Sequence, residues 1–329
     1  MIKHKTTIEI EEALFNIRYQ DNILSMGSCF AQNIASFLAQ NFYPISVNPF
    51  GTLYNPISIR NSLGLLLNNY EFQADDLFFH NGLWSSFQHH SSFSSPSPTT
   101  TLEQINIELI KARTRLQQSK VLILTFGTAW VYELRKNNKV VSNCHKMPAN
   151  RFKRKRLSVA EIIESLGPLL EYLKEYLPEL NIILTVSPIR HLKDGFVENQ
   201  LSKSTLLLAV QEMVSRASFI HYFPAYEIMM DDLRDYRYYA DDLVHPSKLA
   251  IQYIWEHFAN HYLDPKELAI RNSIAKLQKA IQHRPFNPKS NGHQKFVLQQ
   301  LKNIDKIQKK VPTLNLETAK QHFSEQLIT

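Results

Sequence analysis

The chain has 329 residues, of which 44% are hydrophobic, so it is long enough for one large α/β domain with an appendage or for two domains. It contains no apolar stretch approaching the roughly 18 residues that a membrane-spanning helix needs. Its only cysteines, Cys29 and Cys144, are far apart in the sequence, which argues against a disulfide framework and against a structural zinc site.

The net charge of +7 is unevenly distributed along the chain. Residues 265–329 hold 12 Lys/Arg against 4 Asp/Glu, whereas the remaining 264 residues hold 25 against 26. We expect this basic segment to mediate oligomer or surface contacts rather than to bind nucleic acid, because it carries no nucleic-acid recognition motif. The alternative is association with RNA or a membrane through the same segment, which salt would weaken. The basic N-terminus is followed by Glu9, Glu11 and Glu12 rather than by an apolar core, so we expect no secretory leader and a cytoplasmic location.

Short apolar runs alternate with helical patterns along the first part of the chain. Strands are predicted at 23–27, 43–47, 121–126, 182–186 and 218–223. Helices are predicted at 30–40, 102–118, 159–177, 199–217 and 247–262, and Gly167-Pro168 is expected to kink or interrupt the third of these. Apolar strands that alternate with helices indicate an α/β three-layer sandwich around a central, mainly parallel five-stranded sheet.

Two insertions are predicted to decorate this core. Residues 77–93 contain Asn81-Gly82 between aromatic-rich arms, which is a hairpin signal, and residues 131–141 form a second candidate hairpin. The basic cluster at 151–156 is expected to be a solvated loop. Beyond Tyr262 the pattern is helical, basic and rich in Gln. We therefore expect an α/β domain over 1–264 and a basic helical C-terminal extension over 265–329.

Ser28 is expected at the turn between the first strand and the first helix. Free backbone N–H groups and the helix dipole favour developing negative charge at such a turn, which suits a nucleophile. The alternative is that Ser28 only caps the helix, since capping residues are commoner than nucleophiles at such junctions.

Asp242 and His245 are the candidate partners of such a nucleophile. They stand three residues apart after the fifth predicted strand and just before a helix, so one loop can bring the carboxylate and the imidazole together. Gly27, Gly51 and Gly127 lie at or just beyond the ends of the first three strands. Ligands of open α/β sheets bind at this edge, so the pattern favours a site there.

These residues carry a resemblance to a known family. Gly27-Ser28-Cys29-Phe30-Ala31 matches the signature of the GSCFA family, a branch of the SGNH (GDSL-like) hydrolase superfamily. The blocks around Gly51, Gly127, His191 and His245 also resemble family blocks and occur in the expected order. The resemblance implies an SGNH or flavodoxin-like fold, with Ser28 as nucleophile, His245 as general base and Asp242 as the residue that orients the imidazole.

The resemblance also implies an oxyanion hole. The backbone N–H groups of Ser28 and Gly51 fit two of its donors. The superfamily places an Asn side chain after the third strand, where this chain has Ala129, so Thr128 is the nearest substitute. Losing one such donor typically lowers turnover by about 10²–10³-fold.

Cys29 is the competing nucleophile, because a thiolate at a helix N-terminus is reactive. Its side chain is expected to point about 100° away from that of Ser28, so only one of the two can face His245. We expect Ser28 to do so and Cys29 to pack against the sheet as a small apolar residue.

Arg190 and His191 follow the fourth strand and are expected to contact substrate, Arg190 by holding a carboxylate or phosphate. No metal-binding spacing is present, and we expect neither a metal nor a cofactor. The sequence predicts a serine esterase or acyltransferase that acts on a small-molecule or glycan acyl ester. The alternative is a protein of the same fold that binds a carbohydrate or nucleotide without hydrolysing it.

Overall fold

The structure is a computed structural model that describes residues 6–10 and 13–327. The first five residues, Glu11 and Glu12, which bear on the expectation about a leader, lie outside the described residues. Among the described residues, no helix is long and apolar enough to cross a membrane.

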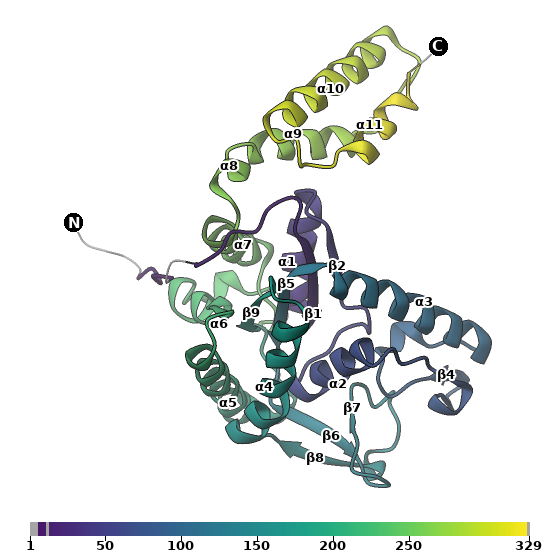
Figure 1. Ribbon diagram of the computed structural model, residues 1–329, viewed down its shortest axis with the longest axis vertical. Coiled ribbons are helices and arrows are strands. Elements are labelled where there is room, and N and C mark those ends of the chain that lie inside the picture. The colour runs from purple at the N-terminus through teal and green to yellow at the C-terminus, as the bar shows by residue number, and fades with distance from the viewer. Residues whose placement is uncertain (1–5, 11–12, 328–329) are drawn as a thin grey trace.

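A five-stranded sheet forms the centre of the molecule (Figure 1). Its strands run in the order β10-β9-β5-β1-β2, and every neighbouring pair is parallel. The strands are β1 (Asn22–Gly27), β2 (Ile45–Val47), β5 (Ser119–Phe126), β9 (Asn181–Val186) and β10 (Ile220–Phe223). The predicted parallel sheet is confirmed.

Helices cover both faces of the sheet, which is why successive strand residues are buried. Ile23 packs on one face with α1 (Cys29–Gln40) and α7 (Lys248–Tyr262), whereas Leu24 packs on the other. That second face is covered by α2 (Pro56–Leu67), α3 (Pro98–Gln117), α4 (Val159–Tyr176) and α5 (Gly195–Arg216). Each strand therefore needs apolar residues at consecutive positions.

Two elements differ from the sequence-based expectation. Helix α2 had not been predicted, although Asn55 and Pro56 carry the signals of a helix start, a capping side chain followed by proline. Helix α4 continues through Gly167-Pro168 to Tyr176. Pro168 lies on its exposed side, where the carbonyl group left without a donor can bind water.

The first insertion is the predicted hairpin, β3 (Phe78–His80) and β4 (Leu83–Ser85). Asn81 and Gly82 form the tight turn between the two strands, and both adopt the positive φ that such a turn requires, 49° and 79°. The second insertion is a three-stranded antiparallel sheet of β7 (Val140–Val141), β6 (Trp130–Leu134) and β8 (Phe152–Arg156). The basic cluster is thus not a loop: β8 pairs with β6, and its alternate residues point to opposite sides.

The remaining short elements connect the sheet to its surroundings. They are η1 (Ala74–Asp76), η2 (Ser91–Phe93), η3 (Ala149–Arg151), η4 (Leu192–Asp194), α6 (Ala225–Glu227), η5 (Ile228–Asp232) and η6 (Tyr236–Tyr238).

The C-terminal residues form α8 (Pro265–Leu268), α9 (Arg271–Ile281), α10 (Asn291–Lys310) and α11 (Glu317–Ser324). Figure 1 shows α9, α10 and α11 at the end of the molecule opposite β6 and β8. The short helix α8, which precedes them, adjoins the start of β1, where its Glu267 accepts hydrogen bonds from Tyr19 N and Tyr43 Oη. The basic helices therefore lie at the amino edge of the sheet, away from the carboxyl ends of the strands.

Candidate functional site

A pocket of about 700 Å³ lies beside the carboxyl ends of β1, β5 and β9. Its floor includes Cys29 and Thr128, and its walls come from β6, β8 and the loops after β9 and β10. Arg190, His191 and His245 all line it, so the loops after β9 and β10 meet at this edge as predicted. Tyr54 and Asn55, from the segment after β2, complete the floor.

Ser28 does not line this pocket. It is the N-cap of α1, and its side chain accepts a hydrogen bond from Phe30 N at 3.3 Å. Its own backbone N–H donates to Thr125 O at 3.1 Å, and only 1% of the residue is exposed. The structure thus gives Ser28 the capping role that the sequence left as the alternative.

Cys29 occupies the position expected for Ser28. It is the first residue of α1, it is partly exposed, and it lines the same pocket as His245. Burial raises the pKa of its thiol. Smaller effects lower this pKa, and they come from hydrogen bonds with its own backbone N–H and the Tyr54 hydroxyl and from the charge of Lys203. Cys29 also packs against the hydrophobic core on the α1 face of the sheet, as expected for a small apolar residue, and it lines the pocket as well.

Asp242 and His245 meet as predicted. Oδ2 of Asp242 lies 2.6 Å from Nδ1 of His245, while Oδ1 accepts hydrogen bonds from the backbone N–H groups of Val244 and His245, both at 2.9 Å. Leu243 adopts a φ of 55°, an unfavourable conformation for a branched side chain that shapes this tight loop. These hydrogen bonds lower the pKa of Asp242 to about 2. The carboxylate fixes Nδ1 as the protonated nitrogen, which leaves Nε2 as the basic atom.

The expected oxyanion-hole donors are engaged elsewhere. The N–H of Gly51 donates to Asn48 O at 2.7 Å, and His90 of the first insertion packs directly against this glycine. The N–H of Thr128 donates to Tyr54 O at 2.9 Å, and its hydroxyl lies 3.0 Å from that of Ser202. The backbone N–H groups of Ser28, Gly51 and Thr128 therefore all donate to carbonyl oxygens within the protein, while Thr128 itself lines the pocket.

Two other residues with N–H donors, Cys29 and Asn55, line the pocket. The N–H of Cys29 lies in the first turn of α1, where a helix has no internal acceptor for it. Its hydrogen bond to the Cys29 thiol lowers the pKa of that thiol. Asn55 caps α2 with Oδ1, which accepts from Ser58 N at 2.8 Å, so Nδ2 remains to donate to a ligand in the pocket that Asn55 lines. Sequence reasoning missed Asn55, although an Asn before Pro at a helix start was visible.

A comparison with protein-family models matches residues 22–258 to the GSCFA family. The chain belongs to this family. A second model, the C-terminal domain of GSCFA domain proteins, matches residues 274–329. A search of curated proteins returned no match. The first match includes every pocket residue named above, and the second covers most of α9 and all of α10 and α11.

Arg190 and His191 line the same pocket of this GSCFA protein. The Arg190 guanidinium lies 4.2 Å from the centre of the Tyr239 ring, and its backbone N–H donates to Val244 O at 3.3 Å. The His191 ring stands edge-on to Tyr54 at 5.6 Å. The loop after β9 is therefore tied to the loop that carries His245.

Lys203 is a second residue that sequence reasoning missed. Its side chain is buried beneath the pocket, and Nζ donates to Gly127 O at 2.7 Å and to Ser187 O at 2.6 Å. Burial lowers its pKa to about 7, and the neighbouring Cys29 thiol acts in the opposite direction. No sequence pattern marked this lysine, because it lies in a helix with ordinary amphipathic spacing.

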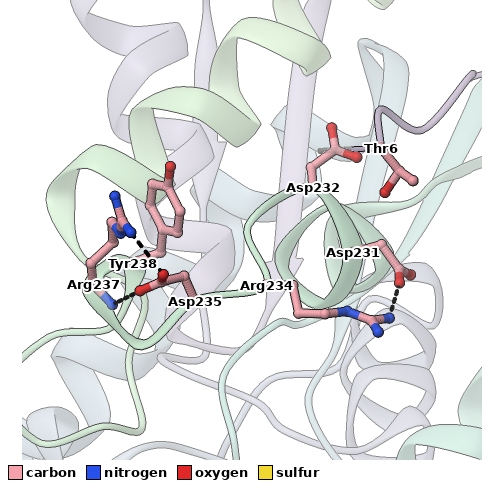
Figure 2. Close-up of a pocket in the computed structure, with 7 residues that line it drawn as sticks. All are labelled: Thr6, Asp231, Asp232, Arg234, Asp235, Arg237 and Tyr238. Atoms are coloured by element: carbon pink, nitrogen blue, oxygen red, sulfur yellow. Dashed lines mark hydrogen bonds and ion pairs between the residues drawn. The ribbon is translucent and has the colours of Figure 1, made fainter. Parts of the chain in front are cut away.

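Another cavity, of about 660 Å³, lies beside η5 and η6 (Figure 2). Its cations are neutralised locally, since Arg234 pairs with Asp231 and Arg237 pairs with Asp235 at 2.9 Å. Among the residues that the structure describes, no cluster of three His, Cys, Asp or Glu side chains is placed to hold a metal ion.

Proposed function

We propose that this GSCFA protein is an acyl-transfer enzyme, an esterase or acyltransferase of SGNH type, that works through an acyl-enzyme. Cys29 is the nucleophile, His245 the general base and Asp242 the residue that orients the imidazole. The observation that carries the proposal is that Cys29, at the start of a helix, and an Asp-oriented His245 line one pocket. Ser28 keeps the turn in place by capping the helix.

The chemistry follows from these positions. Because burial raises the pKa of Cys29, its thiol is protonated at rest and needs a base. Nε2 of His245 takes the proton, and the sulfur attacks the ester carbonyl carbon, forming a C–S bond while the carbonyl electron pair moves to oxygen. The N–H of Cys29 and Nδ2 of Asn55 bind that oxyanion.

The intermediate collapses when the C–O bond to the alcohol breaks and His245 returns the proton to the leaving oxygen. Water or an acceptor hydroxyl then attacks the thioester, with His245 again as base, and releases the acyl group. No hydrogen bond joins Nε2 of His245 to Cys29 among the described residues, so binding of substrate must bring the two together. Both cysteines are free thiols, which fits action in the reducing cytoplasm.

Hydrolysis of short acyl esters and thioesters by the full chain tests the proposal. We expect Cys29→Ala and His245→Gln to lower kcat/KM by about 10²-fold or more, the range of general-base and nucleophile losses. Ser28→Ala retains most of the activity and loses stability. Full activity of Cys29→Ala, or loss confined to Ser28→Ala, contradicts the assignment of the nucleophile.

The absent contact between His245 and Cys29 also favours a second candidate, a protein that binds a carbohydrate or nucleotide without turnover. Saturable binding of such a ligand, unaffected by Cys29→Ala and without release of product, supports this candidate over the enzyme.

A further inference from the structure

The pocket of Cys29 and His245 is lined by cations. Lys146, Arg154, Arg190 and Lys193 all face it, and none of the described residues that line it is acidic. The lining of the cavity in Figure 2 differs, because it includes Asp231, Asp232 and Asp235 beside its arginines. A concave site whose described lining holds cations and no carboxylate attracts an anionic ligand and repels a cationic one.

Aromatic rings, rather than carboxylates, hold two of these cations in place. Arg190 lies over Tyr239 at 4.2 Å and near Tyr236 at 5.7 Å. Lys193 donates from Nζ to Tyr132 Oη at 3.3 Å. Among the described residues, neither side chain forms an ion pair, and the same holds for Lys146. Arg190 also forms a side-chain hydrogen bond with Tyr239, so this tyrosine holds the guanidinium at the pocket while its other N–H groups can donate to a ligand.

The position of Arg190 relates this charge to the reacting centre. Its backbone N–H donates to Val244 O, one residue before His245, so the guanidinium and the imidazole belong to neighbouring, hydrogen-bonded loops. Lys193 follows on the same side of the pocket, and Lys146 lies beyond Cys144 on another wall. A substrate with its carbonyl at Cys29 can thus place an anionic group between the loop after β9 and the second insertion.

We infer that the pocket binds an acyl ester that also carries an anionic group, either a phosphate or a carboxylate. Arg190 is the main residue that binds this group, and Lys193 assists it. This inference deepens the proposed function and rests on it for the ester, but the anion site itself can be measured without any turnover.

A fluorescence titration tests the anion site directly. Trp130 lines the pocket, so its emission reports ligand entry. At constant ionic strength, we expect inorganic phosphate or glutarate to change the emission saturably, and the tighter of the two identifies the oxyanion. Arg190→Gln and Lys193→Gln each weaken binding roughly tenfold, the size expected for one lost hydrogen bond to a charged group. Lys153→Gln, on the same strand β8 but absent from the pocket lining, is the control that leaves binding unchanged.

The same titration with Trp130→Phe shows whether the signal comes from the pocket, since the variant must lose it. No saturable change with either anion, or equal affinity in the wild type and both charge variants, overturns the inference.

A pair of alkylating reagents separates the two proposals. Iodoacetate and iodoacetamide attack a thiol by the same displacement of iodide and differ in the charge of the reagent. The rate of alkylation at Cys29 is measured by peptide mapping, and the rate with iodoacetate is divided by the rate with iodoacetamide. We expect this ratio to be roughly tenfold higher for Cys29 than for the thiol of free glutathione, and to decrease as the salt concentration rises.

Lys193→Gln lowers this ratio, and Lys153→Gln does not. A ratio equal to that of glutathione overturns the inference while leaving a reactive Cys29 intact. A Cys29 that reacts with neither reagent contradicts the proposed nucleophile, and the anion titration then still decides whether the pocket selects oxyanions.

Discussion

The carboxylate of Asp242 makes three contacts with its own loop: one to Nδ1 of His245 at 2.6 Å and two to backbone N–H groups. The pair therefore sets both the tautomer of the imidazole and the shape of the loop that carries it. It lies at the rim of the pocket, where half of each side chain is exposed.

Asp242→Asn tests the orienting role. The amide can still accept the two backbone hydrogen bonds, but it no longer stabilises a His245 cation and can favour the other tautomer. We expect kcat to fall by about 10²–10⁴-fold, as for other acid–base pairs of this kind, with little change in thermal stability. Steady-state kinetics with one ester check this, and an unchanged kcat would remove Asp242 from the mechanism.

The pH dependence of the same carboxylate follows from its contacts. Its pKa is lowered from 3.8 to about 2 by the backbone N–H groups first and then by His245. A lowered pKa in the folded state means that the contribution to loop stability is complete above pH 3.8 and is lost as the pH falls toward about 2. The ¹³C chemical shift of the Asp242 carboxyl should titrate near pH 2, and a midpoint near 4 would show that the loop contacts do not persist in solution.

Asn55 offers a test of the oxyanion hole that separates stability from catalysis. Aspartate caps a helix as well as asparagine does, so Asn55→Asp should leave the free energy of unfolding nearly unchanged. It removes the Nδ2 donor, and we expect kcat to fall by about 10²-fold or more. Asn55→Ala is the comparison variant, since it also loses the cap, at a cost of about 1 kcal/mol in urea unfolding. Equal activity of the wild type and Asn55→Asp would exclude Asn55 as a donor.

Lys203 predicts a pH-dependent effect on stability. Because burial lowers its pKa from 10.5 to about 7, the unfolded chain binds more protons than the folded chain between these values. The wild type should therefore gain stability relative to Lys203→Met as the pH rises from 6 to 9. At pH 9 the variant is the less stable by about 1–3 kcal/mol, because Gly127 O and Ser187 O lose their buried donor. Urea unfolding at several pH values checks the trend, and a stability difference independent of pH would contradict it.

The sheet could be predicted from the sequence because its signals are local. Each strand is a short apolar run between helical patterns, and the parallel arrangement follows from that alternation. The contact between Asp242 and His245 was predictable for the same reason, because the two residues are three positions apart in one loop. The strand β8 was not, because its pairing with β6 joins segments about 20 residues apart and its basic residues look solvated in isolation.

The sequence did not settle which side chain lines the pocket together with His245. The helix α1 begins at Cys29 with Ser28 as its cap, one residue before the predicted start, and Cys29 lines the pocket. Helix boundaries are set by capping geometry that a hydrophobic pattern does not resolve. The hydrogen bond from Thr128 N to Tyr54 O joins segments far apart in the sequence, which no local pattern reveals.

The central claim is that Cys29 forms the acyl-enzyme. It is tested most directly by mixing the full chain with a slowly turning-over ester, quenching in acid and mapping the acyl group by peptide mass spectrometry. We expect an acyl adduct on Cys29 that hydroxylamine removes and that is absent from His245→Gln on the same timescale. An adduct on Ser28, or turnover of the ester with Cys29→Ala at the wild-type rate, would contradict it.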